Sequence, residues 1–364
     1  MNNQASNPAN LLGLDYTKEA AGFKKFEQPL IDVHTHLIGN ESVRIYKRAA
    51  ALYGIGLSYS MTPLEYLPII KQIMGETVRF IAVPRFRGSD PIYDHGAGYI
   101  ERLKGYYKQG ARIAKFWTAP RIFALLDRPF ASHPLKLNSP LRLQTIQAAC
   151  DLGMILMVHV GDPDTWFKTK YADSARFGGK REQYDSLEDI LSRFTVPVIA
   201  AHMGGWIEDL NFLSRLLESY PHLYLDSSAT KWMVREISKH AGKDVQRFFS
   251  RWKTRILFGS DIVSSDSLEG QAAESRQMSE QLTFELYASR YWALRKLFES
   301  DYHGPSPIAD PDLSLIEPGR YSELDAPDLH GQSLDQDLLE RLYYKNAAEL
   351  LDPLFMEKTK TEIP

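Results

Sequence analysis

Two patterns of apolar and polar residues alternate along this chain. Short runs rich in β-branched and aromatic residues are separated mostly by segments whose apolar residues recur at helical spacing. Several helical segments end at a glycine or proline just before the next run, as helices do. We predict eight strands, the second being the weakest, at residues 30–36, 56–62, 78–86, 111–117, 154–160, 196–203, 223–229 and 255–261.

This succession predicts the fold class. Strand and helix repeated eight times are typical of a parallel sheet with crossover helices, and eight units favour an α/β fold of the (β/α)8 TIM barrel type. A doubly wound open sheet is the alternative, and it is disfavoured because no G-x-G-x-x-G follows the first run. We expect one barrel over residues 28–352, after an N-terminal tail and docking segment over 1–27 and before a C-terminal tail over 353–364.

Three segments are longer than ordinary connections in such a barrel. Residues 118–140 and 161–185 follow the fourth and fifth runs, so they are expected on the face that carries barrel active sites. Residues 301–336, rich in proline, aspartate and serine, form an insertion near the C-terminus. Because long loops in compact domains are usually functional or disordered, we expect this insertion to be a lid, a packing arm or an oligomer contact.

Polar residues interrupt the apolar runs mainly near their C-terminal ends. His34 and His36 end the first run, and residues two apart on a strand face the same way. Each such residue alone is compatible with a core histidine, a surface histidine or a helix cap. Together they would meet at one barrel mouth, where a metal ion could satisfy several costly polar groups at once. Besides His34 and His36, this set of polar residues contains His159, His202, Asp226 and Asp261, which lie in runs five to eight.

The constellation resembles the signature of the metal-dependent amidohydrolase superfamily, and more narrowly its amidohydrolase 2 branch, which includes aminocarboxymuconate-semialdehyde decarboxylase-like enzymes. The resemblance rests on H-x-H after the first run, single histidines in the fifth and sixth, an aspartate after the eighth, and "RLYYKNAAELLD" near the C-terminus. It implies one divalent metal, with Zn²⁺ expected and Mn²⁺ compatible with the same ligands. The implied ligands are His34, His36, His159 and Asp261, and the implied catalytic residues are His202 and Asp261.

Several residues near the same strand ends are expected to bind substrate. Lys115 breaks the apolar fourth run, and the resemblance implies that it anchors an acidic substrate as a cation. Arg85, and less strongly Arg87, follow the third run and offer a planar fork for a carboxylate. Trp117 is expected to form part of the pocket wall.

A second arrangement of the metal site stays open. Related binuclear hydrolases carry a carbamylated lysine on the fourth strand, where it bridges two metals. With Lys115 modified in this way, His159 and His202 would bind the second ion. The branch that the chain resembles favours the unmodified, substrate-binding lysine.

The expected reaction is hydrolysis of an ester, lactone or amide bond in a small carboxylated substrate. Non-oxidative decarboxylation or hydration at a similar metal site is the alternative, and a barrel that only binds a partner is disfavoured by the intact ligand set. The net charge of −3 argues against a nucleic-acid partner. No apolar run is long enough for a membrane helix, and the single cysteine fits a reducing, cytoplasmic compartment. A homodimer remains an open possibility.

Overall fold

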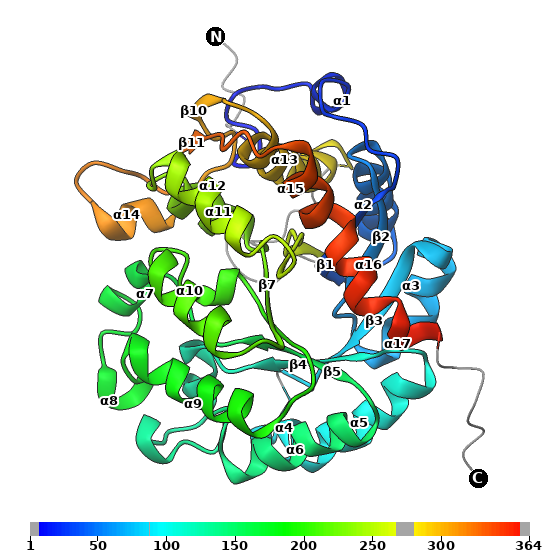
Figure 1. Cartoon of the computed structure of the whole chain (residues 1–364), viewed down its shortest axis with the longest axis vertical. Helices are drawn as coiled ribbons and strands as arrows, with labels where there is room; N and C mark the ends of the chain where they lie inside the picture. The colour runs from blue at the N-terminus through cyan, green and yellow to red at the C-terminus, as the bar shows by residue number, and fades with distance from the viewer. Residues whose placement is uncertain (1–6, 87, 267–279, 357–364) are drawn as a thin grey trace.

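The structure is a computed structural model that describes residues 7–86, 88–266 and 280–356. Within these residues, the main sheet has nine parallel strands, which neighbour one another in the order of the chain. The last strand pairs with the first, which closes the barrel seen in Figure 1. The strands are β1 (Leu30–Leu37), β2 (Ile55–Ser60), β3 (Val78–Ala82), β4 (Ile113–Trp117), β5 (Ile155–His159), β6 (Val198–Ala200), β7 (Leu223–Asp226), β8 (Ile256–Leu257) and β9 (Ile262–Ser264).

The strands β8 and β9 together occupy the place of the eighth barrel strand. The backbone N–H of Val33 donates to the carbonyl of Phe258 at 2.9 Å, and the N–H of Asp261 donates to the carbonyl of His34 at 2.8 Å. β1 is therefore hydrogen-bonded to β2 on one side and to the β8–β9 segment on the other. The expected (β/α)8 barrel is confirmed.

The helices surround the strands, as expected for crossover connections (Figure 1). Gly110 and Gly153 lie just after two outer helices with φ of +90° and +70°, a conformation that glycine adopts without a steric penalty. The longer helices are α2 (Glu41–Leu52), α3 (Leu67–Met74), α5 (Ala97–Lys108), α6 (Pro140–Asp151), α9 (Lys180–Arg193), α10 (Leu210–Ser219), α11 (Thr230–Ile237), α12 (Gly242–Arg251) and α13 (Glu280–Glu299). The shorter ones are α1 (Tyr16–Ala20), α4 (Pro91–His95), α7 (Asp164–Lys168), α8 (Ser174–Phe177), α14 (Asp312–Ile316), α15 (Gln336–Glu340), α16 (Asn346–Leu351) and α17 (Pro353–Met356).

Most of the barrel strands are rich in apolar residues because both faces of the sheet are covered. In β5, the four residues Ile155 to Val158 are all buried, and only His159 at the C-terminal end is partly exposed. Strands buried on both faces read as continuous apolar runs and not as an alternating pattern. A polar residue at the end of such a strand therefore lies at the barrel mouth, where the site is built. None of the described helices is long and apolar enough to cross a membrane.

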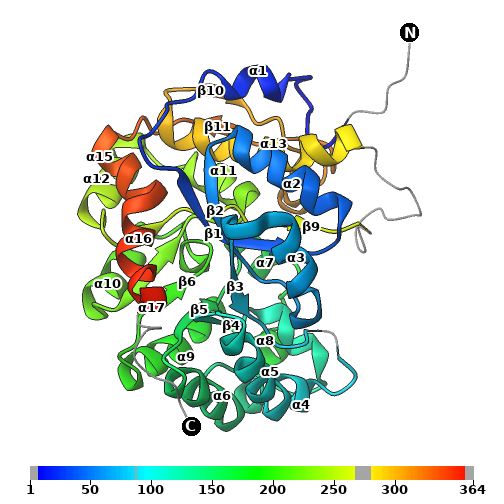
Figure 2. The ribbon, with the colours of Figure 1, turned by 90° about the vertical axis from the view of Figure 1, so that its right-hand side faces the viewer.

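The insertion at residues 301–336 is packed onto the body of the protein. Its strands β10 (His303–Pro305) and β11 (Asp328–His330) form an antiparallel pair. The pair lies at the same end of the molecule as α1 and α13 in both views (Figures 1 and 2). Two backbone hydrogen bonds, Leu11 to Pro307 at 2.9 Å and Ala309 to Pro8 at 2.8 Å, join it to the N-terminal segment. Of the three roles considered, these contacts match a packing arm.

Candidate active site

Left-handed backbone conformations shape the loops at the barrel mouth. His202, Ala229 and Asp261 have φ of +59°, +65° and +59°, and they lie just after β6, β7 and β8. Positive φ is uncommon for residues other than glycine, and each such residue costs about 1–3 kcal/mol. Such strain persists only where surrounding contacts enforce it, and it concentrates at functional sites.

Three of the predicted metal ligands meet in one cluster. The Nε2 atoms of His34 and His36 lie 3.4 Å and 3.2 Å from the same oxygen of Asp261. These donor atoms all lie within 4.8 Å of one another, which is close enough for one ion. His34 is buried, whereas His36 and Asp261 are partly exposed, so the cluster opens toward the mouth.

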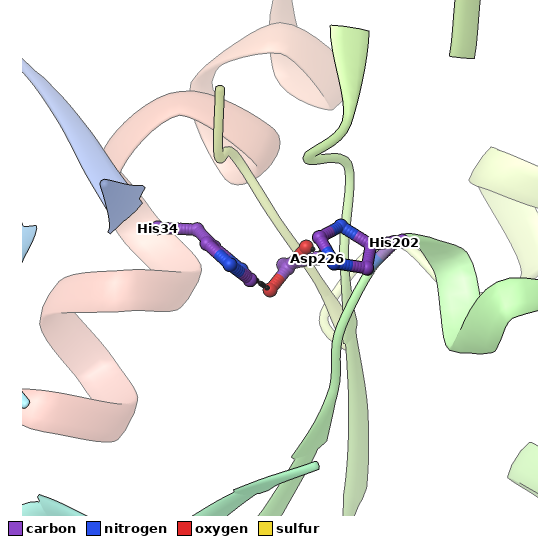
Figure 3. Close-up of side chains that lie close together, drawn as sticks. All are labelled: His34, His202 and Asp226. Carbon is purple, nitrogen blue, oxygen red and sulfur yellow. Dashed lines mark hydrogen bonds and ion pairs between the residues drawn. The ribbon is translucent and has the colours of Figure 1, made fainter. Parts of the chain in front are cut away.

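Asp226, at the end of β7, fixes the orientation of His34. One Asp226 oxygen lies 2.9 Å from Nδ1 of His34, and the other accepts the backbone N–H groups of His202 at 2.9 Å and Ser228 at 3.0 Å. Figure 3 shows the three side chains His34, Asp226 and His202 turned toward one another. Burial alone would raise the pKa of Asp226, but the neighbouring His34 outweighs it and holds the pKa below its ordinary value. An ionised Asp226 accepts a hydrogen bond from the N–H at Nδ1 of His34, which leaves the lone pair of Nε2 for a metal.

The donor atoms of His34, His202 and Asp226 also lie within 4.8 Å of one another, so they form a second geometrically possible metal group. Both oxygens of Asp226 already accept hydrogen bonds, as described above. The group of His34, His36 and Asp261 therefore fits a metal better.

His202 lies next to the cluster, with one ring nitrogen engaged. Its Nδ1 atom is 2.7 Å from the hydroxyl of Ser228, and that hydroxyl donates to Asp226. Nδ1 of His202 is therefore the protonated nitrogen, and Nε2 carries the lone pair. Burial, followed by the nearby His159, lowers the pKa of His202 well below its ordinary value. The ring is neutral at physiological pH.

The structure places His159, the fourth predicted ligand, beside this cluster. Its Nε2 atom lies 2.9 Å from Oδ1 of Asp162, whose other oxygen accepts the hydroxyl of Tyr171 at 2.8 Å. Its ring packs edge-on against that of His202, with centroids 4.4 Å apart. The role of His159 as a ligand stays a prediction. Asp162 was not singled out from the sequence, although its position three residues after His159 was a usable signal.

Lys115 points into the same cluster from β4. Its amine lies 3.5 Å from Nε2 of His34, and the residue is only 3% exposed. Burial lowers the pKa of Lys115 to about 8, although Asp226 and Asp261 act in the opposite direction. Most of the amine is still protonated at pH 7, while a neutral fraction is available for carbamylation.

The other two predicted substrate-binding residues differ from Lys115 in their surroundings. The side chain of Arg85 is 62% exposed and lies 3.9 Å from Glu65. Trp117, at the end of β4, is partly buried and packs edge-on against Phe86 at 5.7 Å between ring centroids. Arg85 and Lys115 therefore do not form one buried cationic surface, and Arg87 lies outside the described residues. The roles of Arg85 and Trp117 stay predictions.

Two tryptophans form a wall beside the histidines. The ring of Trp232, from α11, lies 5.5 Å from that of His202, and Trp166, from α7, packs edge-on against Trp232 at 5.2 Å. The indole N–H of Trp166 donates to Asp312 of the insertion at 2.7 Å. No motif or spacing in the sequence indicated these two residues, because they belong to separate helices that meet only in the folded chain.

Comparison with known proteins gives one clear result. The amidohydrolase family model matches residues 31–352, most of the chain. No curated protein matches the sequence.

Similar solved structures include a zinc-bound amidohydrolase from Burkholderia multivorans (11% identity, covering 88% of this chain and 98% of that one, TM-score 0.45). They also include a 2,6-dihydroxybenzoate decarboxylase from Rhizobium (11% identity, covering 73% of this chain and 99% of that one, TM-score 0.41). A third is a manganese-bound 5-carboxyvanillate decarboxylase from Novosphingobium aromaticivorans (11% identity, covering 73% of this chain and 96% of that one, TM-score 0.40). Similarity at this level leaves the reaction open.

Proposed function

Because the chain belongs to the amidohydrolase family, we propose that it is a metal-dependent enzyme that hydrolyses an ester, lactone or amide bond in a small carboxylated substrate. The observation that carries this proposal is the meeting of Nε2 of His34, Nε2 of His36 and Oδ1 of Asp261 at the barrel mouth. Residues at the C-terminal ends of barrel strands are where catalysis takes place in this fold.

The donor set fits a divalent metal. Two imidazoles and one carboxylate are ligands that zinc and manganese accept, and the contact between His34 and Asp226 is the usual support for a metal-binding histidine. We assign His34, His36 and Asp261 as ligands, with His159 as the fourth if it gives up its contact with Asp162. A bound divalent ion would polarise the scissile carbonyl and make a water molecule more acidic.

The other polar residues of the site would transfer protons or bind the substrate. Nε2 of His202 carries the lone pair, so it accepts a proton from the attacking water and returns it to the leaving group. Asp261 orients the same water with its second oxygen. Lys115, mostly protonated at pH 7, holds the substrate carboxylate beside the cluster.

One observation favours a second reaction on the same site. Trp232 and Trp166, whose rings are nearly perpendicular, offer aromatic surface next to His202. A planar unsaturated acid would stack there with its carboxylate toward Lys115, an arrangement suited to non-oxidative decarboxylation.

A substrate screen of metal-loaded protein separates these alternatives. We would incubate it with lactones, esters, dipeptides and carboxylated aromatic acids, and measure acid release and carbon dioxide separately. Acid release without carbon dioxide supports hydrolysis, and carbon dioxide from an aromatic acid supports the second candidate. His202→Asn is the matched inactive control, since it keeps the three ligands. Turnover by metal-free protein at the rate of the loaded protein would contradict both reactions.

A further inference from the structure

A buried arginine next to the end of β4 has few hydrogen-bond partners. Arg142, in the first turn of α6, is fully buried. One terminal nitrogen, Nη2, donates to the carbonyl of Trp117 at 3.2 Å. The Nε and Nη1 atoms have no hydrogen-bond partner among the described residues. Burial lowers the pKa of Arg142 to about 10, so the guanidinium stays charged at neutral pH.

His95, at the end of α4, is a second buried group without partners near Arg142. It is fully buried, and neither ring nitrogen has a hydrogen-bond partner in the part of the chain that the structure describes. Its ring centroid lies 6.1 Å from that of Phe86. Burial and then the charge of Arg142 lower the pKa of His95 to about 2, so the imidazole is neutral and supplies one N–H donor.

The other buried arginines among the described residues have partners for their charge or their N–H groups. Arg235 pairs with Glu236 at 2.6 Å and with Asp310, and Arg295 pairs with Glu299 at 2.5 Å. Arg112 donates to two backbone carbonyls, at 2.8 Å and 3.2 Å. Arg142 has one carbonyl contact and no described carboxylate. A buried charge without a counter-charge costs several kcal/mol, so something must compensate for it.

We propose that Arg142 and His95 bind a small monovalent inorganic anion, with chloride as the physiological example, between α4 and α6. The free N–H groups are one on Nε and two on Nη1 of Arg142, and one on His95. A halide accepts all of them as a single atom, whereas a phosphate brings a second charge and four oxygens into a fully buried place. Because Arg142 also contacts Trp117 at the end of β4, the anion would stabilise this part of the barrel mouth.

Thermal unfolding in sodium chloride and in sodium gluconate at equal ionic strength tests the proposal. Chloride should stabilise the wild type, and above the dissociation constant each tenfold rise in chloride should raise the folding equilibrium constant about tenfold. Arg142→Met should lose this dependence and show only the general salt effect. Arg112→Met is the matched control, because it removes a buried arginine with carbonyl partners, and it should keep the full chloride dependence.

A second measurement covers the case in which Arg142→Met fails to fold. Crystals of the wild type grown with sodium bromide should show an anomalous peak beside Nε and Nη1 of Arg142. Equal stability of the wild type in chloride and gluconate, together with no bromide peak there, would overturn the proposal. It would also be overturned if Arg142→Met kept the chloride dependence of the wild type.

Discussion

Replacing Asp226 with asparagine tests whether this residue sets the protonation of His34. The substitution keeps the shape of the side chain. The new amide oxygen is expected to stay on the backbone N–H groups of His202 and Ser228, which both donate to Oδ1. The amide NH₂ then faces Nδ1 of His34, where Asp226 now places an acceptor at 2.9 Å.

The substitution Asp226→Asn would affect the metal cluster by changing which nitrogen of the His34 ring is protonated. Facing a donor, Nδ1 of His34 must become an acceptor, so its proton moves to Nε2. Nε2 is the atom that lies 3.4 Å from Asp261, and a protonated nitrogen cannot bind a metal. Loss of the outer partner of a metal-binding histidine typically costs 10–100-fold in metal affinity. Because the tautomer is also wrong, we expect about 100-fold, or about 2.7 kcal/mol.

The assay is a titration of metal-free protein with zinc in competition with a chelating indicator. Asp209→Asn is the matched control, since Asp209 caps α10 by accepting the N–H of Phe212 at 2.8 Å and has no described contact with the cluster. Both variants should unfold cooperatively. Wild-type zinc affinity in Asp226→Asn would refute the assignment of Nε2 of His34 as a ligand. A complete loss of zinc binding would instead favour the group that includes Asp226 itself.

Three further predictions concern the cluster and its neighbours. His34→Ala and Asp261→Ala should each remove the metal and the activity together, as measured by elemental analysis and turnover. His202→Asn should keep the metal and lower kcat by roughly 10²–10⁴, and loss of metal from it would favour the binuclear site. Lys115→Ala should raise KM for an acidic substrate at unchanged metal content, and added bicarbonate should not alter metal uptake by the wild type. Two ions bridged by a modified Lys115 would contradict this last prediction.

The fold was predictable because each strand is buried on both faces and each crossover is helical. The ends of several strands differ from expectation, and for two of them the local reason is clear. The third run was expected to extend to residue 86, but β3 ends at Ala82, since Pro84 has no N–H for a sheet. The eighth run was expected to be continuous over 255–261, yet the chain bends at Asp261 and pairs again as β9. The bend follows from the left-handed conformation that places Asp261 beside the histidines.

The candidate site was predictable only in part. That polar strand ends converge follows from the barrel alone, and it brings His34, His36 and Asp261 together. The barrel fold does not predict which residue orients which ligand, because this depends on side-chain contacts between strands. The pair of His34 and Asp226 joins positions 192 residues apart, and Asp226 stood in the sequence as one more polar strand end.

The insertion at residues 301–336 and the aromatic wall behave as one unit. Asp312 accepts the indole N–H of Trp166 at 2.7 Å and the amine of Lys170 at 3.1 Å, although Trp166 lies 146 positions earlier in the chain. Arg235 also reaches Asp312, at 3.4 Å, from the helix that carries Trp232. The carboxylate of Asp312 therefore binds Trp166 directly and the helix that carries Trp232 through Arg235. Because none of His34, His36 and Asp261 takes part in these contacts, we expect a change at Asp312 to move Trp166 and leave that cluster in place.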